Sequence, residues 1–143
     1  MEATNMSFHL HITGVLTLTA LFTLMEPARI LIPPPTLTSP VNGALMDNGC
    51  LDRSNGITWD FDWSDVPGAT AYHIRVWRNP NLPVVNNTSV ATSEYQHDSP
   101  QSYIINTNRT GWRWMVRARV GRVWGPWSRV GFFRVERLNT DCP

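Results

Sequence analysis

The segment from Trp112 to Val135 constrains the fold of this chain more than any other. In its first part, Trp112–Val120 (WRWMVRARV), large apolar side chains alternate with arginines and one methionine. Successive side chains of a β-strand point to opposite faces, so this pattern predicts a strand with one buried and one arginine-rich face. The connection that follows, WGPWS, contributes Trp124 and Trp127, whose indole rings stack well against flat guanidinium groups. The segment therefore predicts two strands joined by a tryptophan-rich connection.

Other segments also predict strands, and none shows the 3.6-residue period of a helix. Ile57–Trp63 (ITWDFDW) alternates throughout and places Asp60 and Asp62 on its outward face. A second alternating strand follows, with apolar side chains on one face and His73, Arg75 and Trp77 on the other. Further strands are expected at Leu37, Ser93–His97, Ser102–Asn106 and Val130–Leu138, the last with Phe133 and Val135 inward. About seven strands in a chain of this length predict an all-β sandwich of one domain.

The first 26 residues differ in character from the rest. Ile12–Met25 is an uncharged run of apolar residues and threonines, too short to span a bilayer but of the length of a signal-peptide core. No Lys or Arg precedes the run and no A-x-A site follows it, so an uncleaved membrane anchor and a buried strand or helix remain alternatives. We expect a signal peptide at residues 1–26, a proline-rich extended arm at 27–35 and a folded domain at 36–143, in a secreted, extracellular protein.

The two cysteines, Cys50 and Cys142, lie near the ends of the expected domain. Neither belongs to a C-x-x-C pair and no histidine lies at ligand spacing from them, so they do not predict a zinc site. We expect one disulfide bond between them in an oxidising compartment. Two unpaired thiols in a reducing compartment are the alternative.

Charges are distributed unevenly along the chain. All 12 basic residues are arginine, and the net charge is +1. Residues 47–65 hold five carboxylates and one arginine, whereas residues 109–137 hold eight arginines and one glutamate. These charges either neutralise one another across neighbouring strands or form a surface with opposite poles. The modest net charge of an exported chain does not favour nucleic acid as a partner.

Four segments together resemble a fibronectin type III domain. They are TSPVNG (Thr38–Gly43), FDWSDVPGATAYHIRV (Phe61–Val76), WRWMVRA (Trp112–Ala118) and WSRVGFFRV (Trp127–Val135). The resemblance covers roughly residues 34–138 and implies a single seven-stranded immunoglobulin-like sandwich. In that topology the two cysteines lie at the same pole, in agreement with the expected disulfide bond. The aromatic residue that begins the penultimate strand is usually tyrosine in this family, and here it is tryptophan.

The connection Trp124–Ser128 resembles the WSXWS element of haematopoietic cytokine receptors, with Gly125 in place of the first serine. This resemblance implies a ladder of stacked tryptophans and arginines. Its members would be Trp124, Trp127, Arg117 and Arg119.

Catalytic motifs are scarce in this sequence. His73 and His97 lie in the expected domain with no serine or cysteine motif to form a nucleophile–base pair. Asp60 and Asp62 are neighbours on one strand face, about 7 Å apart, and no loop supplies further oxygen ligands for calcium. We therefore expect no enzyme activity, no catalytic residue, no cofactor and no metal ion.

Binding is better supported than catalysis. On the expected topology one outer face is cationic and aromatic, and the opposite outer face carries Asp60 and Asp62. The arginines either take part in binding or only stiffen the tryptophan-rich corner. Candidate ligand-binding residues are Trp77, Arg75, His73, Arg113 and Arg134.

Three asparagines open N-x-S/T sequons in expected loops and are candidate glycosylation sites: Asn86, Asn87 and Asn108.

These features predict a secreted, non-catalytic binding or adhesion module of a cell surface or extracellular matrix, with an extracellular protein or glycan as partner. One alternative is a carbohydrate-binding, lectin-like protein that uses an exposed Trp77 beside Arg75. Another is a self-assembling structural subunit, a homo-oligomer built by head-to-tail contacts between oppositely charged faces. In that case the proline-rich arm can add a strand to a neighbour's sheet edge. Membrane contact is expected only if the signal is uncleaved.

Overall fold

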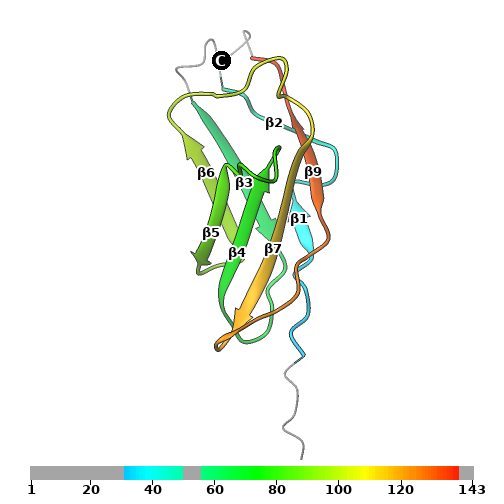
Figure 1. Ribbon diagram of the computed structural model, residues 1–143, viewed down its shortest axis with the longest axis vertical. Coiled ribbons are helices and arrows are strands. Elements are labelled where there is room, and N and C mark those ends of the chain that lie inside the picture. The colour runs from blue at the N-terminus through cyan, green and yellow to red at the C-terminus, as the bar shows by residue number, and fades with distance from the viewer. Residues whose placement is uncertain (1–30, 50–55, 139–143) are drawn as a thin grey trace, which may run out of the picture.

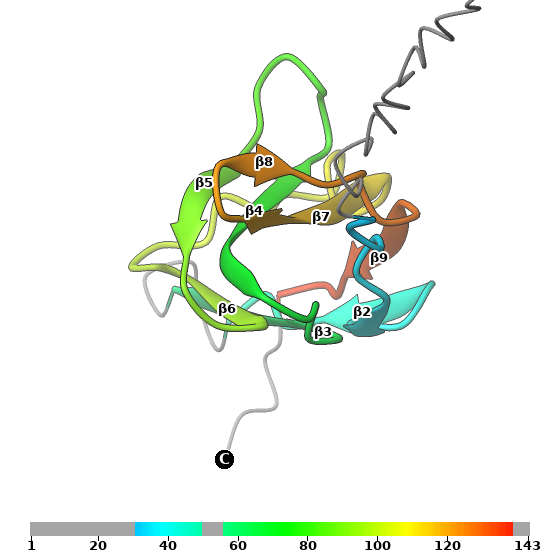
Figure 2. The same cartoon turned by 90° about the horizontal axis from the view of Figure 1, so that it is seen from below.

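Two β-sheets packed face to face form the part of the chain that the computed structural model describes, residues 31–49 and 56–138 (Figure 1). The three-stranded sheet has the order β1 (Leu37–Ser39), β3 (Ile57–Trp63) and β6 (Glu94–Ser99). The six-stranded sheet has the order β2 (Ala44–Met46), β9 (Gly131–Val135), β7 (Trp112–Val120), β4 (Ala69–Trp77) and β5 (Val85–Val90), and β8 (Val123–Trp124) pairs with β7. Seen from one end, β4, β7 and β8 lie on one side of the core and β3 and β6 on the other (Figure 2).

This architecture confirms the predicted all-β sandwich. Neighbouring strands are antiparallel except β2, which runs parallel to β9. Strands β1, β3–β7 and β9 form the immunoglobulin-like arrangement, and the short strands β2 and β8 add to it. The predicted signal peptide and both cysteines lie outside the described residues. Within the described ranges, no helix is long and apolar enough to cross a membrane.

Aromatic side chains from alternate positions of β3, β7 and β9 build the core. In β3 and β7 the inward apolar side chains are buried, except half-buried Val120, and those between them are exposed or half-buried, as predicted. The ring of Trp59 lies edge-on to Trp112 at 5.3 Å and to Phe133 at 5.2 Å between centroids, and Phe61 lies 5.0 Å from Trp114. Such contacts contribute roughly 0.5–1.5 kcal/mol each beyond the burial of apolar area. The inward positions predicted for Phe133 and Val135 are also confirmed.

The prediction of a strand at Ser102–Asn106 is wrong. This segment connects β6 in one sheet to β7 in the other, and it forms no ladder with either sheet. Side chains satisfy its backbone instead: the amide of Ile104 donates to Ser102 Oγ at 3.1 Å, and that of Ile105 donates to Asn108 Oδ1 at 2.7 Å. Short polar side chains compete with ladder bonds in this way. Ile104 still enters the core, with an exposed fraction of 2%.

Trp112 occupies the position where tyrosine is usual in fibronectin type III domains. Its indole Nε1–H donates to the carbonyl oxygen of Asn108 at 2.7 Å. A tyrosine hydroxyl in such a corner makes an equivalent bond to backbone a few residues upstream. The indole N–H of Trp112 thus makes a hydrogen bond that fixes the entry to β7.

Residues 31–35, the described part of the proline-rich arm, pack on their own domain. Ile32 belongs to the core and is 7% exposed, and Pro35 is buried as well. Leu31, at the start of the described chain, is 92% exposed. Within this part of the arm Ile32 and Pro35 are therefore anchored to the domain, whereas Pro33 and Pro34 stay exposed.

Candidate functional site

The charged residues that lie in strands are divided by sign between the two sheets. The arginines that lie in strands all belong to the six-stranded sheet, and no strand of that sheet contains Asp or Glu. The carboxylates that lie in strands all belong to the three-stranded sheet, which contains no arginine. Since no ion pair joins residues within 31–49 and 56–138, neutralisation across neighbouring strands does not occur there. Of the two interpretations of the charge pattern, the one with two oppositely charged faces is therefore correct for these strands.

The predicted tryptophan–arginine ladder is present on the outer face of the six-stranded sheet. The Arg117 guanidinium lies 4.9 Å from the ring centroid of Trp124 and 4.5 Å from that of Trp127. Arg119 lies over Trp124 at 5.5 Å. Each such contact is worth about 0.5–2 kcal/mol, the upper end applying to desolvated pairs.

Backbone hydrogen bonds hold the WGPWS connection against β7. The amide of Gly125 donates to the Ala118 carbonyl at 2.8 Å, and the amide of Ser128 donates to the Val116 carbonyl at 2.7 Å. The Val116 amide in turn donates to Ser128 Oγ at 3.0 Å. The two tryptophans are therefore fixed above the outward face of β7 before the chain enters β9.

His73 is part of this ladder and is buried, with an exposed fraction of 7%. It was expected to lie on the surface as a candidate ligand-binding residue. Its ring lies 4.7 Å from Trp127, and its Nδ1 accepts a hydrogen bond from Arg117 Nε at 3.3 Å. Because Nδ1 is an acceptor, the neutral ring carries its proton on Nε2, which donates to Asn86 Oδ1 at 2.7 Å. Burial lowers the pKa of His73, and nearby guanidinium groups lower it further.

Trp77 is 8% exposed, so the expectation of an exposed stacking platform is wrong. It lies at the end of β4 beside Arg75, whose guanidinium is 5.7 Å from the indole centroid. Arg75 is half-buried, and its Nη2 donates to the carbonyl oxygen of Pro80 at 3.3 Å. Residues 78–84, which return the chain from β4 to β5, thus engage the arginine that covers the ring.

Arg113 and Arg134 remain exposed and donate no hydrogen bond within the described residues. Arg113 lies opposite Phe132 in the β7–β9 ladder, with its guanidinium 5.7 Å from the phenyl centroid. Phe132 itself is 47% exposed. We call Arg113, Phe132 and Arg134 the arginine face. Sequence reasoning missed Phe132, although the alternation GFFRV directs one of its two phenylalanines outward.

The opposite outer face carries four exposed carboxylates on β3 and β6, which we call the acidic face: Asp60, Asp62, Glu94 and Asp98. Asp62 and Glu94 stand directly opposite each other in the ladder. Asp60 accepts a hydrogen bond from Gln96 at 2.8 Å, and Asp98 accepts one from Thr58 at 2.8 Å. In the described residues, no group of three or more His, Cys, Asp and Glu side chains could hold a metal ion.

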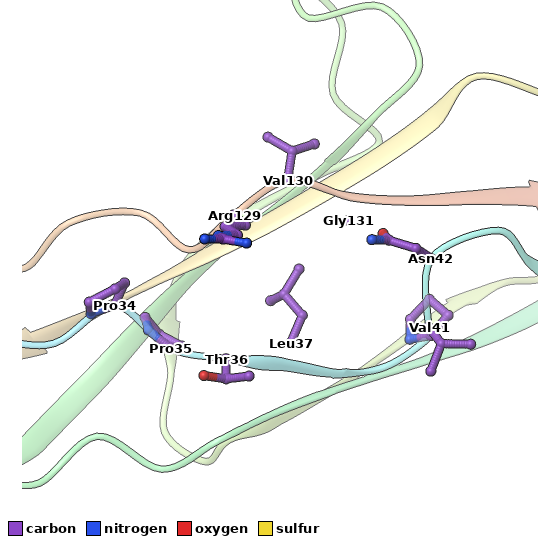
Figure 3. A pocket seen from close by; sticks show the side chains of 10 residues that line it. Pro34, Pro35, Thr36, Leu37, Val41, Asn42, Arg129, Val130 and Gly131 are labelled. Carbon is purple, nitrogen blue, oxygen red and sulfur yellow. The ribbon is translucent and has the colours of Figure 1, made fainter.

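An apolar groove of about 470 Å³ opens between the start of β1 and the start of β9 (Figure 3). Its walls are mostly proline and aliphatic side chains, among them Pro34, Leu37 and Val130, with Arg129 at one side. Leu37 points toward Gly131, where an added Cβ would lie 2.9 Å from Leu37 Cδ1. The groove is a seam between the two sheets and brings together no set of catalytic groups.

Two of the candidate glycosylation residues, Asn86 and Asn87, lie in β5 rather than in a loop. The prediction of a single strand between Val84 and Gln101 missed β5, because only Val85 and Val90 of its six residues are buried. Asn86 is exposed and bonded to His73, and Asn87 Oδ1 accepts from the Ser89 amide at 2.9 Å. Asn108 lies in a turn, where its amide group bonds to backbone through both Oδ1 and Nδ2.

Comparison with known proteins finds similarity at the level of solved structures. No protein-family model matches the chain, and no curated protein matches it. It is similar to a solved Fn3-like protein from Clostridium thermocellum, with 21% identity and a TM-score of 0.46. The match covers 75% of this chain and 96% of that chain. The fold assignment rests on the strand order given above.

Acidification is expected to destabilise the fold through buried His73 and half-buried His97. Burial lowers the pKa values of both His73 and His97 in the folded state. An unfolded histidine titrates near about pH 6.5, so below this pH the unfolded chain binds protons that the folded chain does not. The free energy of unfolding, measured with urea, should change little between about pH 8 and 6.5 and fall between about pH 6.5 and 5. His73→Gln should reduce this slope, and an unchanged slope would contradict the role assigned to His73.

Gly125→Ser should destabilise the domain because the glycine makes room for Ile32. A Cβ at Gly125 would lie 2.4 Å from Ile32 Cγ2, well inside van der Waals contact. We expect a loss of about 1–3 kcal/mol in the free energy of unfolding. In the double variant with Ile32→Ala the two losses should be less than additive, because the smaller side chain relieves the clash. The control is Val123→Ser, at a site that is 58% exposed, which should change the free energy of unfolding by less than about 0.5 kcal/mol. Full additivity of the two losses in the double variant would argue against the contact between residue 125 and Ile32.

Proposed function

We propose that this chain is a secreted, non-catalytic binding module of a cell surface or extracellular matrix, and that it binds an acidic extracellular protein or glycan through its arginine face. The expected signal peptide and disulfide bond favour export. The absence of a nucleophile–base pair from the sequence patterns favours a binding role over catalysis.

One observation carries the proposal. Arg113 and Arg134 are exposed, lack a carboxylate partner among the described residues, and flank a half-exposed Phe132. Arginine recognises carboxylates and sulfates through paired donors, and an adjacent ring adds apolar contact area. By contrast, Arg117 and Arg119 are engaged with tryptophan rings and serve to position the WGPWS connection. The face therefore combines two free cations with a rigid support.

A lectin that binds neutral sugars is less well supported. Such a site needs an exposed aromatic ring, whereas Trp77 is 8% exposed and Trp124 and Trp127 are stacked with arginine. Phe132 is the ring that remains accessible beside the two arginines. This combination favours an anionic glycan or an acidic protein surface over an uncharged saccharide.

Binding to immobilised heparin tests the proposal, since this sulfated polysaccharide is a dense polyanion. The full chain should bind at low salt and elute as ionic strength rises, because exposed charge contacts are screened. The double variant Arg113→Gln/Arg134→Gln should bind about tenfold more weakly, as expected for the loss of two exposed charge contacts.

The matched control is Arg122→Gln/Arg137→Gln, which removes the same charge from exposed positions outside the strands. It should retain most of the affinity. Equal losses in both double variants would show that net charge alone drives binding. That result, or no binding by the unmodified chain, would overturn the assignment of the arginine face.

A further inference from the structure

The acidic face is an outer sheet surface whose four carboxylates are exposed. Asp62 and Glu94 are directly opposed on neighbouring strands, an arrangement that destabilises a sheet by like-charge repulsion. The two hydrogen bonds to carboxylates on this face come from the neutral side chains of Gln96 and Thr58, and neither supplies a positive charge. No arginine lies in any strand of this sheet. A cationic surface docked here would offset the repulsion.

The arginine face of the same chain matches this surface in both charge and spacing. Asp60 and Asp62 are alternate residues of one strand, and their side chains are separated by about 7 Å. Arg113 lies opposite Phe132, so Arg134 is its diagonal neighbour on β9, at a separation of roughly 7–8 Å. Two guanidinium groups on one molecule can therefore face two carboxylates on another. Both sets of side chains are exposed and stand on the outer faces of regular sheets.

We propose that the partner of the acidic face is a second copy of this chain, which docks its arginine face there. The two surfaces lie on opposite sides of the sandwich, so the contact is heterologous and leaves one free surface of each kind on every pair. Contacts of this type continue into open chains when their rotation does not close a ring. The proposal shares the arginine face with the proposed function but does not depend on its ligand.

The size of the acidic face predicts that this association is weak. Its strands β3, β6 and β1 have seven, six and three residues. At about 3.4 Å per residue and about 4.8 Å between strands they present an area on the order of 260 Å². A stable dimer buries about 800 Å² on each partner, so this contact belongs to the low-affinity class. Exposed ion pairs are also screened by salt. The expected behaviour is self-association that rises with protein concentration and disappears at high ionic strength.

The proposal is tested by sedimentation equilibrium of the full chain at two salt concentrations. Exposed charges interact at about 20 mM NaCl and are largely screened at about 500 mM NaCl. The weight-average mass should rise with concentration at low salt and equal the monomer mass at high salt. Reversing the acidic face with Asp60→Arg/Asp62→Arg should abolish self-association, as should reversing the arginine face with Arg113→Glu/Arg134→Glu. An equimolar mixture of these two variants should associate, because each supplies the charge that the other has lost.

The mixture experiment distinguishes loss of the interface from misfolding of a variant, because an unfolded variant would not restore association. Arg122→Glu/Arg137→Glu, with the same change in net charge as the arginine-face variant, is the control and should associate like the unmodified chain. A monomer under all conditions, association that high salt does not reduce, or a mixture that stays monomeric would overturn the proposal. Binding of heparin by a strictly monomeric chain would overturn self-association alone and leave the proposed function standing.

Discussion

The contact between Trp59 and the rings of the opposite sheet is the interaction on which the rest of this structure depends. Trp59 lies on β3 and meets Trp112 of β7 and Phe133 of β9 across the core, while its indole N–H donates to the Asp47 carbonyl at 2.8 Å. These contacts fix which face of each strand is inward. Since a strand turns alternate side chains to opposite faces, every charged residue of β3 and β7 is then directed outward. The two charged faces are a consequence of this aromatic core.

The ladder on the outer face of the six-stranded sheet divides its arginines into two groups. Arg117 and Arg119 stack on tryptophans and, with His73, hold the WGPWS connection in place. Arg113 and Arg134 lie beyond the reach of that connection and stay exposed. Gly125 completes the arrangement, because its lack of a side chain leaves room for Ile32 to pack against the connection. The same segment thus stabilises the fold and limits which arginines are free to bind.

Local alternation predicted the strands whose pattern is regular. The resemblance of the WGPWS connection to the WSXWS element implied the stack of Arg117 with Trp124 and Trp127. It failed where distant residues decide the outcome. His73 and Trp77 occupy outward positions of β4, yet they are buried because the WGPWS connection covers the first and Arg75, held by Pro80, covers the second. No periodicity within β4 contains that information. Strand β5 was missed for a related reason: it is an edge strand with polar residues at four of its six positions, and its pairing with β4 defines it.

The central claim is that an anionic ligand binds on the arginine face and not on the acidic face or in the groove between β1 and β9. The most direct test is a two-dimensional ¹H–¹⁵N NMR titration of the full chain with a sulfated oligosaccharide, which observes backbone amides and arginine side chains residue by residue. We predict that, at a protein concentration where the chain is monomeric, the shifts concentrate on Arg113, Phe132 and Arg134, and that the amides of β3 and β6 are unchanged. Shifts confined to residues around Asp60, or to those around Leu37, would contradict the account.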